Sequence, residues 1–271
     1  MAMIPPSGFL ERIVSDRRRR IAELSARVPG HVLRARLGPA RPAGRLERAL
    51  RRPGAAAPLK LLCEIKRASP SRGLLRADLD PVATARLYER GGAAAISIVT
   101  EPDHFQGDLG WVNAVRPATA LPLLVKDFAL DSYQLLDAAA RGADGVLLLA
   151  ALLSEIQLQR LLGEARLLGL DGLVEVHDEA ELTHALRAGA TLVGINNRDL
   201  HTFEVDLETS LRLLPAVPPL VTAVAESGIA TAGDIARLRT TRCDAVLMGE
   251  VFMKSPDLEA TLAALSAAAR G

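Results

Sequence analysis

The chain has 271 residues, of which 49% are hydrophobic, and its 33 Lys and Arg balance 32 Asp and Glu. A chain of this length and apolar content can bury a large core, which excludes wholesale disorder. The near-zero net charge gives no general reason to expect nucleic acid or an anionic membrane as a partner. The 2 cysteines are too few for a disulfide framework and lack metal-ligand spacing. We therefore expect a cytoplasmic protein without a metal site.

The first part of the chain has a helical pattern. Apolar residues recur at near-helical spacing from Phe9 to Val28, Ser7 is a suitable N-cap, and Pro29-Gly30 ends the run. The basic run 17–20 is interpreted as a solvated helix face. The start lacks the apolar core of a signal peptide, and no later stretch is long and uncharged enough to span a bilayer.

Residues 39–58 are rich in Pro, Gly, Ala and Arg, which predicts a loop region with a short helix at 45–51. We expect residues 1–57 to form an N-terminal helical extension of a catalytic domain at 58–271.

After Pro58, short β-branched or Leu-rich runs alternate with helical stretches. Several of these stretches begin with Asp, Ser or Thr and end near Gly, as capped helices do. The helices are expected within 80–92, 131–143, 154–169, 178–190 and 231–241. The strands are expected at 59–66, 94–100, 121–127, 144–150, 171–177, 191–197, 219–226 and 244–250.

About eight βα units with a mean period near 25 residues favour an α/β fold, a (β/α)8 TIM barrel. A doubly wound open sheet also alternates strands and helices, but it usually carries an early G-x-G-x-x-G turn. No such motif follows the first strand here. We therefore predict the barrel.

Polar residues gather where the predicted strands end, and a barrel places its catalytic groups at that end. Alternate residues of a strand share a face, so Glu64 and Lys66 point the same way, as do Asn196 and Arg198. Lys126 and Glu175 end two further strands. These groups could be a buried ion-pair network that closes the barrel, but mixed charges at many strand ends favour an active site.

The loops after the last two strands, 226–231 and 248–257, could hold a phosphate. Gly228 and Gly249 would let the backbone approach an anion and Ser227 adds a hydroxyl, although the glycines could simply make tight turns. Residues 69–73 after the first strand could cover the mouth or be a solvated turn. His177 could lie near the site, although capping of the next turn is favoured.

The ordered motifs EIKRASPSRG, SIVTEP-x-x-FQG, KDF, LVEVHDE-x-EL, GINNRDL, ESGI and MGE-x-FM resemble the indole-3-glycerol phosphate synthase family from about residue 60 to the end. The segment LERIVSDRRRRIAEL resembles the extra N-terminal helix of that family. The resemblance implies an enzyme of tryptophan biosynthesis, a carboxy-lyase. It would convert 1-(2-carboxyphenylamino)-1-deoxyribulose 5-phosphate to indole-3-glycerol phosphate, with release of CO₂ and water.

The resemblance also implies roles for single residues. Lys126 would be the general acid, Lys66 would pair with the substrate carboxylate, and Glu175 would be the base. Glu64 would orient the lysines, and Asn196 and Arg198 would hold substrate and site together. The remaining expected substrate-binding residues line the phosphate side or the aromatic ring: Ser69, Ser227, Gly228, Gly249 and Glu250 for the phosphate, and Phe128, Leu147 and Leu247 for the pocket wall.

No step of this reaction needs a redox cofactor or a metal, so we expect none. We expect a small phosphorylated molecule as substrate, no nucleic-acid or membrane partner, and a monomer. The alternatives are another phosphate-binding barrel, such as phosphoribosylanthranilate isomerase, or a barrel that binds a phosphosugar without catalysis. The isomerase uses an acidic and a thiol side chain, and Cys63 lies on the opposite strand face from Glu64 and Lys66.

Overall fold

Eight of the apolar runs form a closed barrel of parallel strands in the computed structural model, which describes residues 8–39 and 41–271. The spatial order β1-β10-β9-β8-β7-β6-β5-β4 is closed by pairing of β4 with β1, so the TIM barrel is confirmed and an open sheet is excluded. The strands are β1 (Lys60–Ile65), β4 (Ala95–Val99), β5 (Leu123–Lys126), β6 (Gly145–Leu149), β7 (Asp171–Val176), β8 (Leu192–Asn196), β9 (Thr222–Glu226) and β10 (Ala245–Met248).

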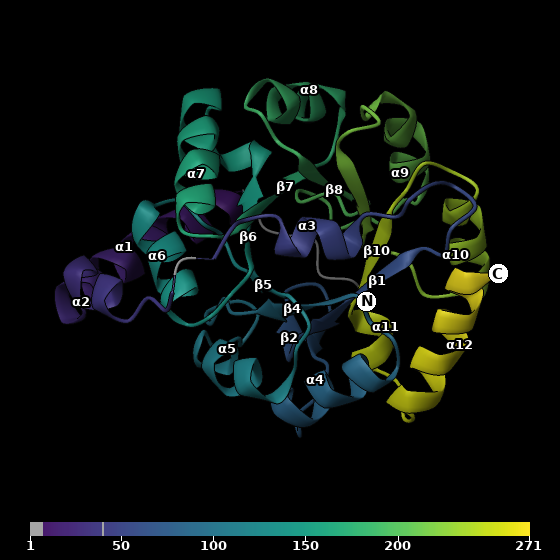
Figure 1. The fold of residues 1–271 in the computed structure, drawn as a ribbon, viewed down its shortest axis with the longest axis horizontal. Helices are drawn as coiled ribbons and strands as arrows, with labels where there is room; N and C mark the ends of the chain where they lie inside the picture. Colours follow the sequence, from purple (N-terminus) through teal and green to yellow (C-terminus); the bar gives the residue numbers. More distant parts are fainter. Residues whose placement is uncertain (1–7, 40) are drawn as a thin grey trace.

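A ring of helices surrounds the strands (Figure 1). Side chains of Asp80, Asp131, Ser154, Asp178 and Thr231 accept backbone N–H groups at the starts of the five expected helices, as N-caps do. These helices are α4 (Pro81–Arg90), α6 (Ser132–Ala140), α7 (Glu155–Leu167), α8 (Glu179–Arg187) and α10 (Ala232–Arg239). The layer also contains α5 (Gly110–Val115), α9 (Glu208–Leu213), α11 (Glu250–Met253), α12 (Leu258–Arg270) and 3₁₀ turns at Arg116–Ala118, Ala150–Leu152 and Leu214–Ala216.

The extension begins with the expected helix, α1 (Phe9–Arg27), while its expected N-cap, Ser7, lies outside the described residues. Pro29 ends this helix, but a second short helix, α2 (Gly30–Ala35), starts directly after it and packs beside α6. This helix is not predicted from the sequence, because its 6 residues are too few to show a helical period. Leu33 is its one buried side chain.

The short helix expected near residue 45 is α3 (Arg45–Leu50), and it closes one end of the barrel. Figure 1 shows α3 lying across the middle of the ring of strands. Leu46 and Leu50 are fully buried and belong to the same core cluster as the inward-facing strand residues. Asp171, at the start of β7, accepts backbone N–H groups from Leu46 at 2.8 Å and Glu47 at 3.0 Å. The carboxylate thus caps α3 from outside the helix.

The alternation of side chains along each strand divides the core into two layers. Leu62, Leu124 and Leu173 point into the barrel, and their neighbours, among them Cys63, pack between the strands and the helices. Two positions beyond these leucines the inward face continues with Glu64, Lys126, Glu175 and their counterparts. The apolar interior therefore ends in a polar layer at the carboxyl ends of the strands.

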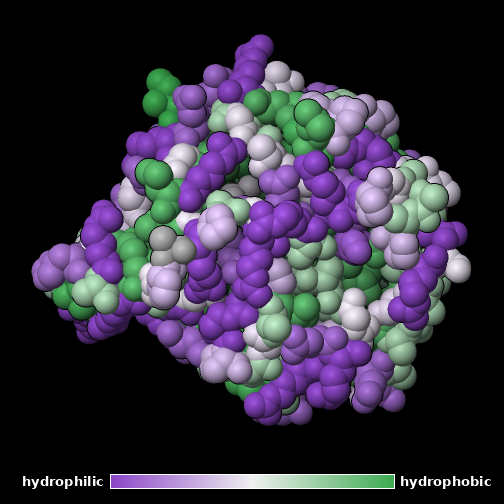
Figure 2. Space-filling view, viewed as in Figure 1, coloured by the Kyte–Doolittle hydropathy of each residue, from purple (hydrophilic) through white to green (hydrophobic). Residues whose placement is uncertain are grey.

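No helix in the described part of the chain is long and apolar enough to cross a membrane. Hydrophilic side chains predominate on the face that Figure 2 shows, which is the face closed by α3, and apolar residues are scattered among them.

We predict that Leu46→Ala destabilises the fold, because it opens a cavity where α3 closes the barrel. Its free energy of unfolding should fall by about 2–5 kcal/mol in urea titrations, the usual range for a buried leucine. The matched control is Leu167→Ala on α7, whose side chain is 89% exposed and should change stability by less than about 0.5 kcal/mol. Equal effects of the two variants would show that α3 adds nothing to the core.

Candidate active site

A cavity of about 420 Å³ opens at the carboxyl ends of the strands, the size of a small-molecule site. The strand ends, the loops that follow them and the start of α1 line it. Every residue that the sequence analysis placed in the site lines this cavity: Glu64, Lys66, Ser69, Lys126, Phe128, Leu147, Glu175, Asn196, Arg198, Ser227, Gly228, Leu247, Gly249 and Glu250.

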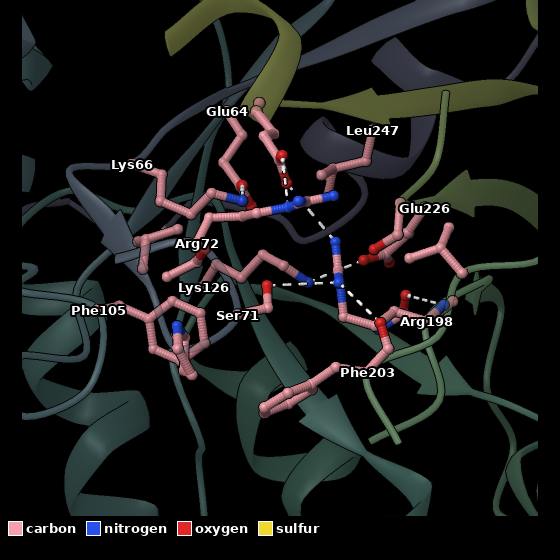
Figure 3. A pocket seen from close by; sticks show the side chains of 18 of the residues that line it. Glu64, Lys66, Ser71, Arg72, Phe105, Lys126, Arg198, Phe203, Glu226 and Leu247 are labelled. Atoms are coloured by element: carbon pink, nitrogen blue, oxygen red, sulfur yellow. Dashed lines mark hydrogen bonds and ion pairs between the residues drawn. The ribbon is translucent and has the colours of Figure 1, made fainter. Parts of the chain in front are cut away.

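Lys126 lies at the centre of the cavity floor, at the end of β5. Its Nζ donates to Glu226 Oε2 from β9 at 2.8 Å (Figure 3). It also donates to Glu175 Oε2 from β7 at 2.8 Å. Burial alone would lower the pKa of Lys126, but the two carboxylates outweigh it and raise the pKa above its usual value. The lysine is therefore held as a charged ammonium group.

The two carboxylates have different proton affinities. Burial alone would raise the pKa of Glu175, but Lys126 and then His177 lower it below its usual value. Burial raises the pKa of Glu226 to about 7, helped by the charge of Glu175 and opposed by Lys126. Glu226 Oε1 is buried and has no hydrogen-bond partner among the described residues, whereas Glu175 Oε1 accepts from Asn196 at 2.9 Å. One site thus holds an ionised carboxylate and one that can carry a proton.

Glu226 is not among the site residues expected from the sequence. The sequence did carry a signal, because Glu226 ends an apolar run. In the structure it is paired in register with Asn196. Its side chain fits because Gly194 on the neighbouring strand has no Cβ, which would overlap the Glu226 carboxylate. A glycine inside a strand can mark such a close approach.

Lys66 and Glu64 form a second ion pair on the inward face at the end of β1, with Lys66 Nζ 2.7 Å from Glu64 Oε1. Both side chains are largely buried, with 15% and 3% of their surfaces exposed. A Cβ at Gly249 would collide with Glu64, so this glycine makes room for the carboxylate as well as forming the turn after β10.

Ion pairs between side chains bridge the mouth of the cavity. Arg198 lies 3.6 Å from Glu250, and Arg72 lies 3.3 Å from the same carboxylate. Arg198 also donates to the backbone carbonyl of Phe203 at 3.1 Å and to Ser71 at 3.4 Å. The segment after β1 is therefore a hairpin over the mouth, made of β2 (Ala68–Ser69) and β3 (Gly73–Leu74). Of the two alternatives expected for residues 69–73, covering the mouth is the one that agrees with the contacts of Ser71 and Arg72.

The loop after β9 presents backbone groups to the cavity. Ser227 and Gly228 both have positive φ, of 64° and 73°, and a Cβ at Gly228 would overlap Val205. Ser69 also lines the cavity, and its Oγ is buried and has no hydrogen-bond partner within the described residues. Ser69, Ser227 and Gly228 all line the cavity, so hydroxyl groups and a glycine turn lie where an anion could bind.

Aromatic rings form the remaining wall. Phe105 and Phe128 lie 6.2 Å apart between centroids, and Phe9 of α1 packs edge-on against Phe203 at 5.3 Å. Phe9, Phe105 and Phe203 lie on the N-terminal helix or on loops, so the polar pattern at the strand ends does not predict them in the site.

A buried ion pair fixes α1 against the barrel. Arg17 lies 3.0 Å from Asp127, the neighbour of Lys126, and Arg20 lies 2.9 Å from Asp103. The interpretation of residues 17–20 as a solvated face is wrong for Arg17, which is 6% exposed. The charge run gave no sign of this, because the partners lie more than 80 residues away in sequence.

His177 is expected either near the site or as a cap of the next turn, and it does both. It contacts Glu175 and interacts with the turn that follows. It lies behind Glu175 and is bound to Glu181 at the start of α8. Among residues 8–39 and 41–271, no three His, Cys, Asp or Glu side chains are grouped to hold a metal ion.

Comparisons with known proteins agree with this geometry. A family model described as indole-3-glycerol phosphate synthase matches residues 10–265. The indole-3-glycerol phosphate synthase of Sulfurimonas denitrificans is 47% identical over 76% of this chain and 78% of its own length. That of Carboxydothermus hydrogenoformans is 41% identical over 92% of this chain and 96% of its own length.

Among solved structures, thiamine phosphate pyrophosphorylase from Pyrococcus furiosus superposes with a TM-score of 0.61. The alignment covers 80% of this chain and 98% of that one at 20% identity, so the likeness shows the shared fold alone. Because the family model spans the strands, the cavity and most of the extension, and relatives match nearly the whole length, the chain belongs to the indole-3-glycerol phosphate synthase family.

Proposed function

We propose how the cavity residues divide the work of the family reaction. The chain is a carboxy-lyase that converts 1-(2-carboxyphenylamino)-1-deoxyribulose 5-phosphate to indole-3-glycerol phosphate in tryptophan biosynthesis. Ring closure joins the aryl carbon to the ribulose carbonyl carbon, CO₂ then leaves that aryl carbon, and loss of water completes the indole. The reaction therefore needs a proton donor at the carbonyl oxygen, and later an acid and a base for dehydration.

Lys126 is the proposed general acid. The observation that carries this assignment is its ammonium group between Glu175 and Glu226 at the centre of the cavity floor. As the carbonyl carbon is attacked, negative charge develops on the oxygen, and a positioned ammonium group stabilises and protonates it. Burial and the raised pKa keep the proton on Lys126 until that charge develops.

Glu175 is the proposed base and Lys66 the proposed partner of the substrate carboxylate. The lowered pKa of Glu175 keeps this carboxylate ionised, so that it can remove the proton from carbon during dehydration. Glu64 orients Lys66 through their 2.7 Å ion pair. Lys66 can also assist the departure of the hydroxyl group, and Glu226, with a pKa near 7, is a second group able to supply a proton there.

Substrate binding is proposed to use the two ends of the cavity differently. The phosphate faces the donors of Ser69 and Ser227 and the backbone at Gly228, Gly249 and Glu250, with Arg198 beside them. The aromatic ring lies against the apolar wall, where Phe105 adds to the expected set of Phe128, Leu147 and Leu247.

The isomerase alternative is disfavoured by Cys63. This thiol is fully buried in the layer outside the barrel, and burial raises its pKa far above the usual value. It can neither reach the cavity nor ionise readily. A silent barrel would have no need for a charged lysine between two buried carboxylates.

We propose a cytoplasmic monomer without nucleic-acid or membrane partners, in which residues 1–57 act as an extension of the catalytic domain at 58–271. The exposed large apolar side chains support the monomer, because they are few among the described residues: Leu74, Ile156, Leu167, Val205 and Leu220. The burial of Leu46 and Leu50 inside the barrel end supports treating the extension as part of one domain.

Lys126→Ala should lower turnover of the carboxyphenylamino-deoxyribulose phosphate by at least ~10²-fold, since general acid catalysis commonly supplies that much. Indole fluorescence measures product, and circular dichroism verifies folding. Lys60→Ala, at the opposite end of β1, is the matched control and should keep normal turnover. Near-normal turnover in folded Lys126→Ala would remove this lysine from the role of acid, and absence of product from the wild type would refute the reaction itself.

Glu226→Gln should gain stability relative to the wild type as the pH rises from about 5 to 8. The Glu226 carboxyl has its usual value near 4.5 in the unfolded chain and a pKa of about 7 when folded. The folded state therefore binds this proton more tightly, and the wild type loses that contribution as the pH rises through this window, by at most ~1.4 kcal/mol per pH unit. Urea titrations at several pH values measure it, and a difference independent of pH would contradict the raised pKa.

A further inference from the structure

His177 follows β7 and occupies a place that the proposed mechanism does not use. Its side chain is 15% exposed, and it lies behind Glu175 rather than on the cavity surface. Its ring stands between two carboxylates, Glu175 of β7 and Glu181 of α8. The chemistry of those two neighbours determines where the protons of the imidazole ring lie.

Glu181 fixes one proton on the ring. Its Oε2 accepts the backbone N–H of His177 at 2.8 Å and lies 2.9 Å from ring Nδ1. Glu181 is itself held at the start of α8, where its backbone N–H donates to the N-cap Asp178 at 2.8 Å. An ionised carboxylate can only accept hydrogen bonds, so Nδ1 must carry a proton.

Glu175 favours a proton on the other ring nitrogen. Nε2 is buried, lies 3.5 Å from Glu175 Oε1 and has no hydrogen bond within the described part of the chain. A bare Nε2 would direct its lone pair at a carboxylate oxygen and repel it, whereas a protonated Nε2 attracts it. Burial alone would lower the pKa of His177, but the two carboxylates outweigh it and raise the pKa to about 10.

We propose that His177 is a positioning residue for the base Glu175, forming a carboxylate–imidazolium–carboxylate bridge with Glu181. The proposal rests on the assignment of Glu175 as base. The bridge fixes Glu175 Oε1 from behind while Asn196 donates to the same oxygen at 2.9 Å.

The bridge keeps Glu175 ionised after Lys126 has given up its proton. Lys126 neutralises Glu175 in the free enzyme, but once Lys126 gives its proton to the carbonyl oxygen, Glu175 loses that cation. His177 keeps its charge, so Glu175 stays ionised for the later proton removal. Because both ring nitrogens already carry protons, His177 takes no proton itself, and the one removed from carbon stays on Glu175. The titratable groups around this pair are Lys126 from β5, Glu226 from β9 and Glu181 from α8.

The pH dependence of kcat in His177→Asn and His177→Gln tests the bridge. Asparagine can still donate to Glu181 but does not reach Glu175. We therefore expect kcat to fall roughly tenfold or more, the usual effect of losing a group that holds a functional side chain from behind. KM should change little, since the ring does not line the cavity. The acid limb of the kcat profile should move to higher pH, because Glu175 has lost a cation.

Glutamine can place a neutral donor near the former Nε2. His177→Gln should therefore recover part of kcat at the optimum while the acid limb stays shifted, which separates orientation from charge. Glu181→Gln should shift the limb in the same direction. His31→Asn, at an exposed position on α2, is the matched control.

The proposal is overturned if the acid limb stays in place in every His177 and Glu181 variant, even where kcat or stability falls. Glu175→Gln distinguishes this failure from that of the proposed function. Normal turnover in Glu175→Gln would refute the assignment of Glu175 as base. Loss of turnover in Glu175→Gln, together with an unshifted acid limb in the His177 variants, would refute only the bridge.

Ring ¹⁵N spectra of the wild type supply a second test that requires no variant at His177 to fold. The His177 signal is assigned by elimination with Asn variants of the other histidines, since the chain has 5. At pH 8 we expect both nitrogens of His177 to be protonated, and a neutral ring would overturn the proposal.

Discussion

The ammonium group of Lys126, buried between Glu175 and Glu226, is the interaction on which the rest of the site depends. Burying one cation and two carboxylates is unfavourable unless each group is paired and hydrogen-bonded. The barrel satisfies this condition because β5, β7 and β9 end at one level and direct alternate side chains inward. The leucine layer beneath keeps water out from below, and Gly194 leaves space for the Glu226 carboxylate. The closed barrel is therefore required for these three charged groups to lie together.

The two ends of the barrel use charge for different purposes. At the end closed by α3, Asp171 caps that helix and Asp144 pairs with Arg45 and Arg116, so these carboxylates hold the extension and the loops in place. At the opposite end the charged groups face a cavity. The N-terminal extension reaches both: α3 closes one end, and α1 brings Phe9 to the other, fixed by the pair between Arg17 and Asp127. A chain segment outside the βα repeat thus supplies both stability and part of the site wall.

The sequence predicted the elements whose signals are local. Strand period, helix caps and polar strand ends placed the barrel and brought Glu64, Lys66, Lys126, Glu175 and Asn196 to one cavity. It did not predict features set by contacts between distant segments. Glu226 ends an apolar run, but its place between Gly194 and Lys126 depends on how the strands assemble, and Phe9 and Phe105 reach the cavity only through tertiary packing. Arg17 was misplaced for the same reason, because a charge run does not reveal a buried partner 110 residues away.

The charged groups of the cavity are already paired before any substrate enters, and this constrains how binding energy is used. Lys66 is neutralised by Glu64, Lys126 by two carboxylates, and Arg198 by Glu250. A substrate that carries a carboxylate and a phosphate must exchange these internal partners for its own groups, so much of the attraction is offset in the ground state. The carbonyl oxygen is neutral in the bound substrate and becomes negative only as its carbon is attacked, so its attraction to Lys126, although shared with Glu175 and Glu226, is strongest in the transition state. An arrangement of this kind favours the transition state over the bound substrate, which is the requirement for a high turnover rate.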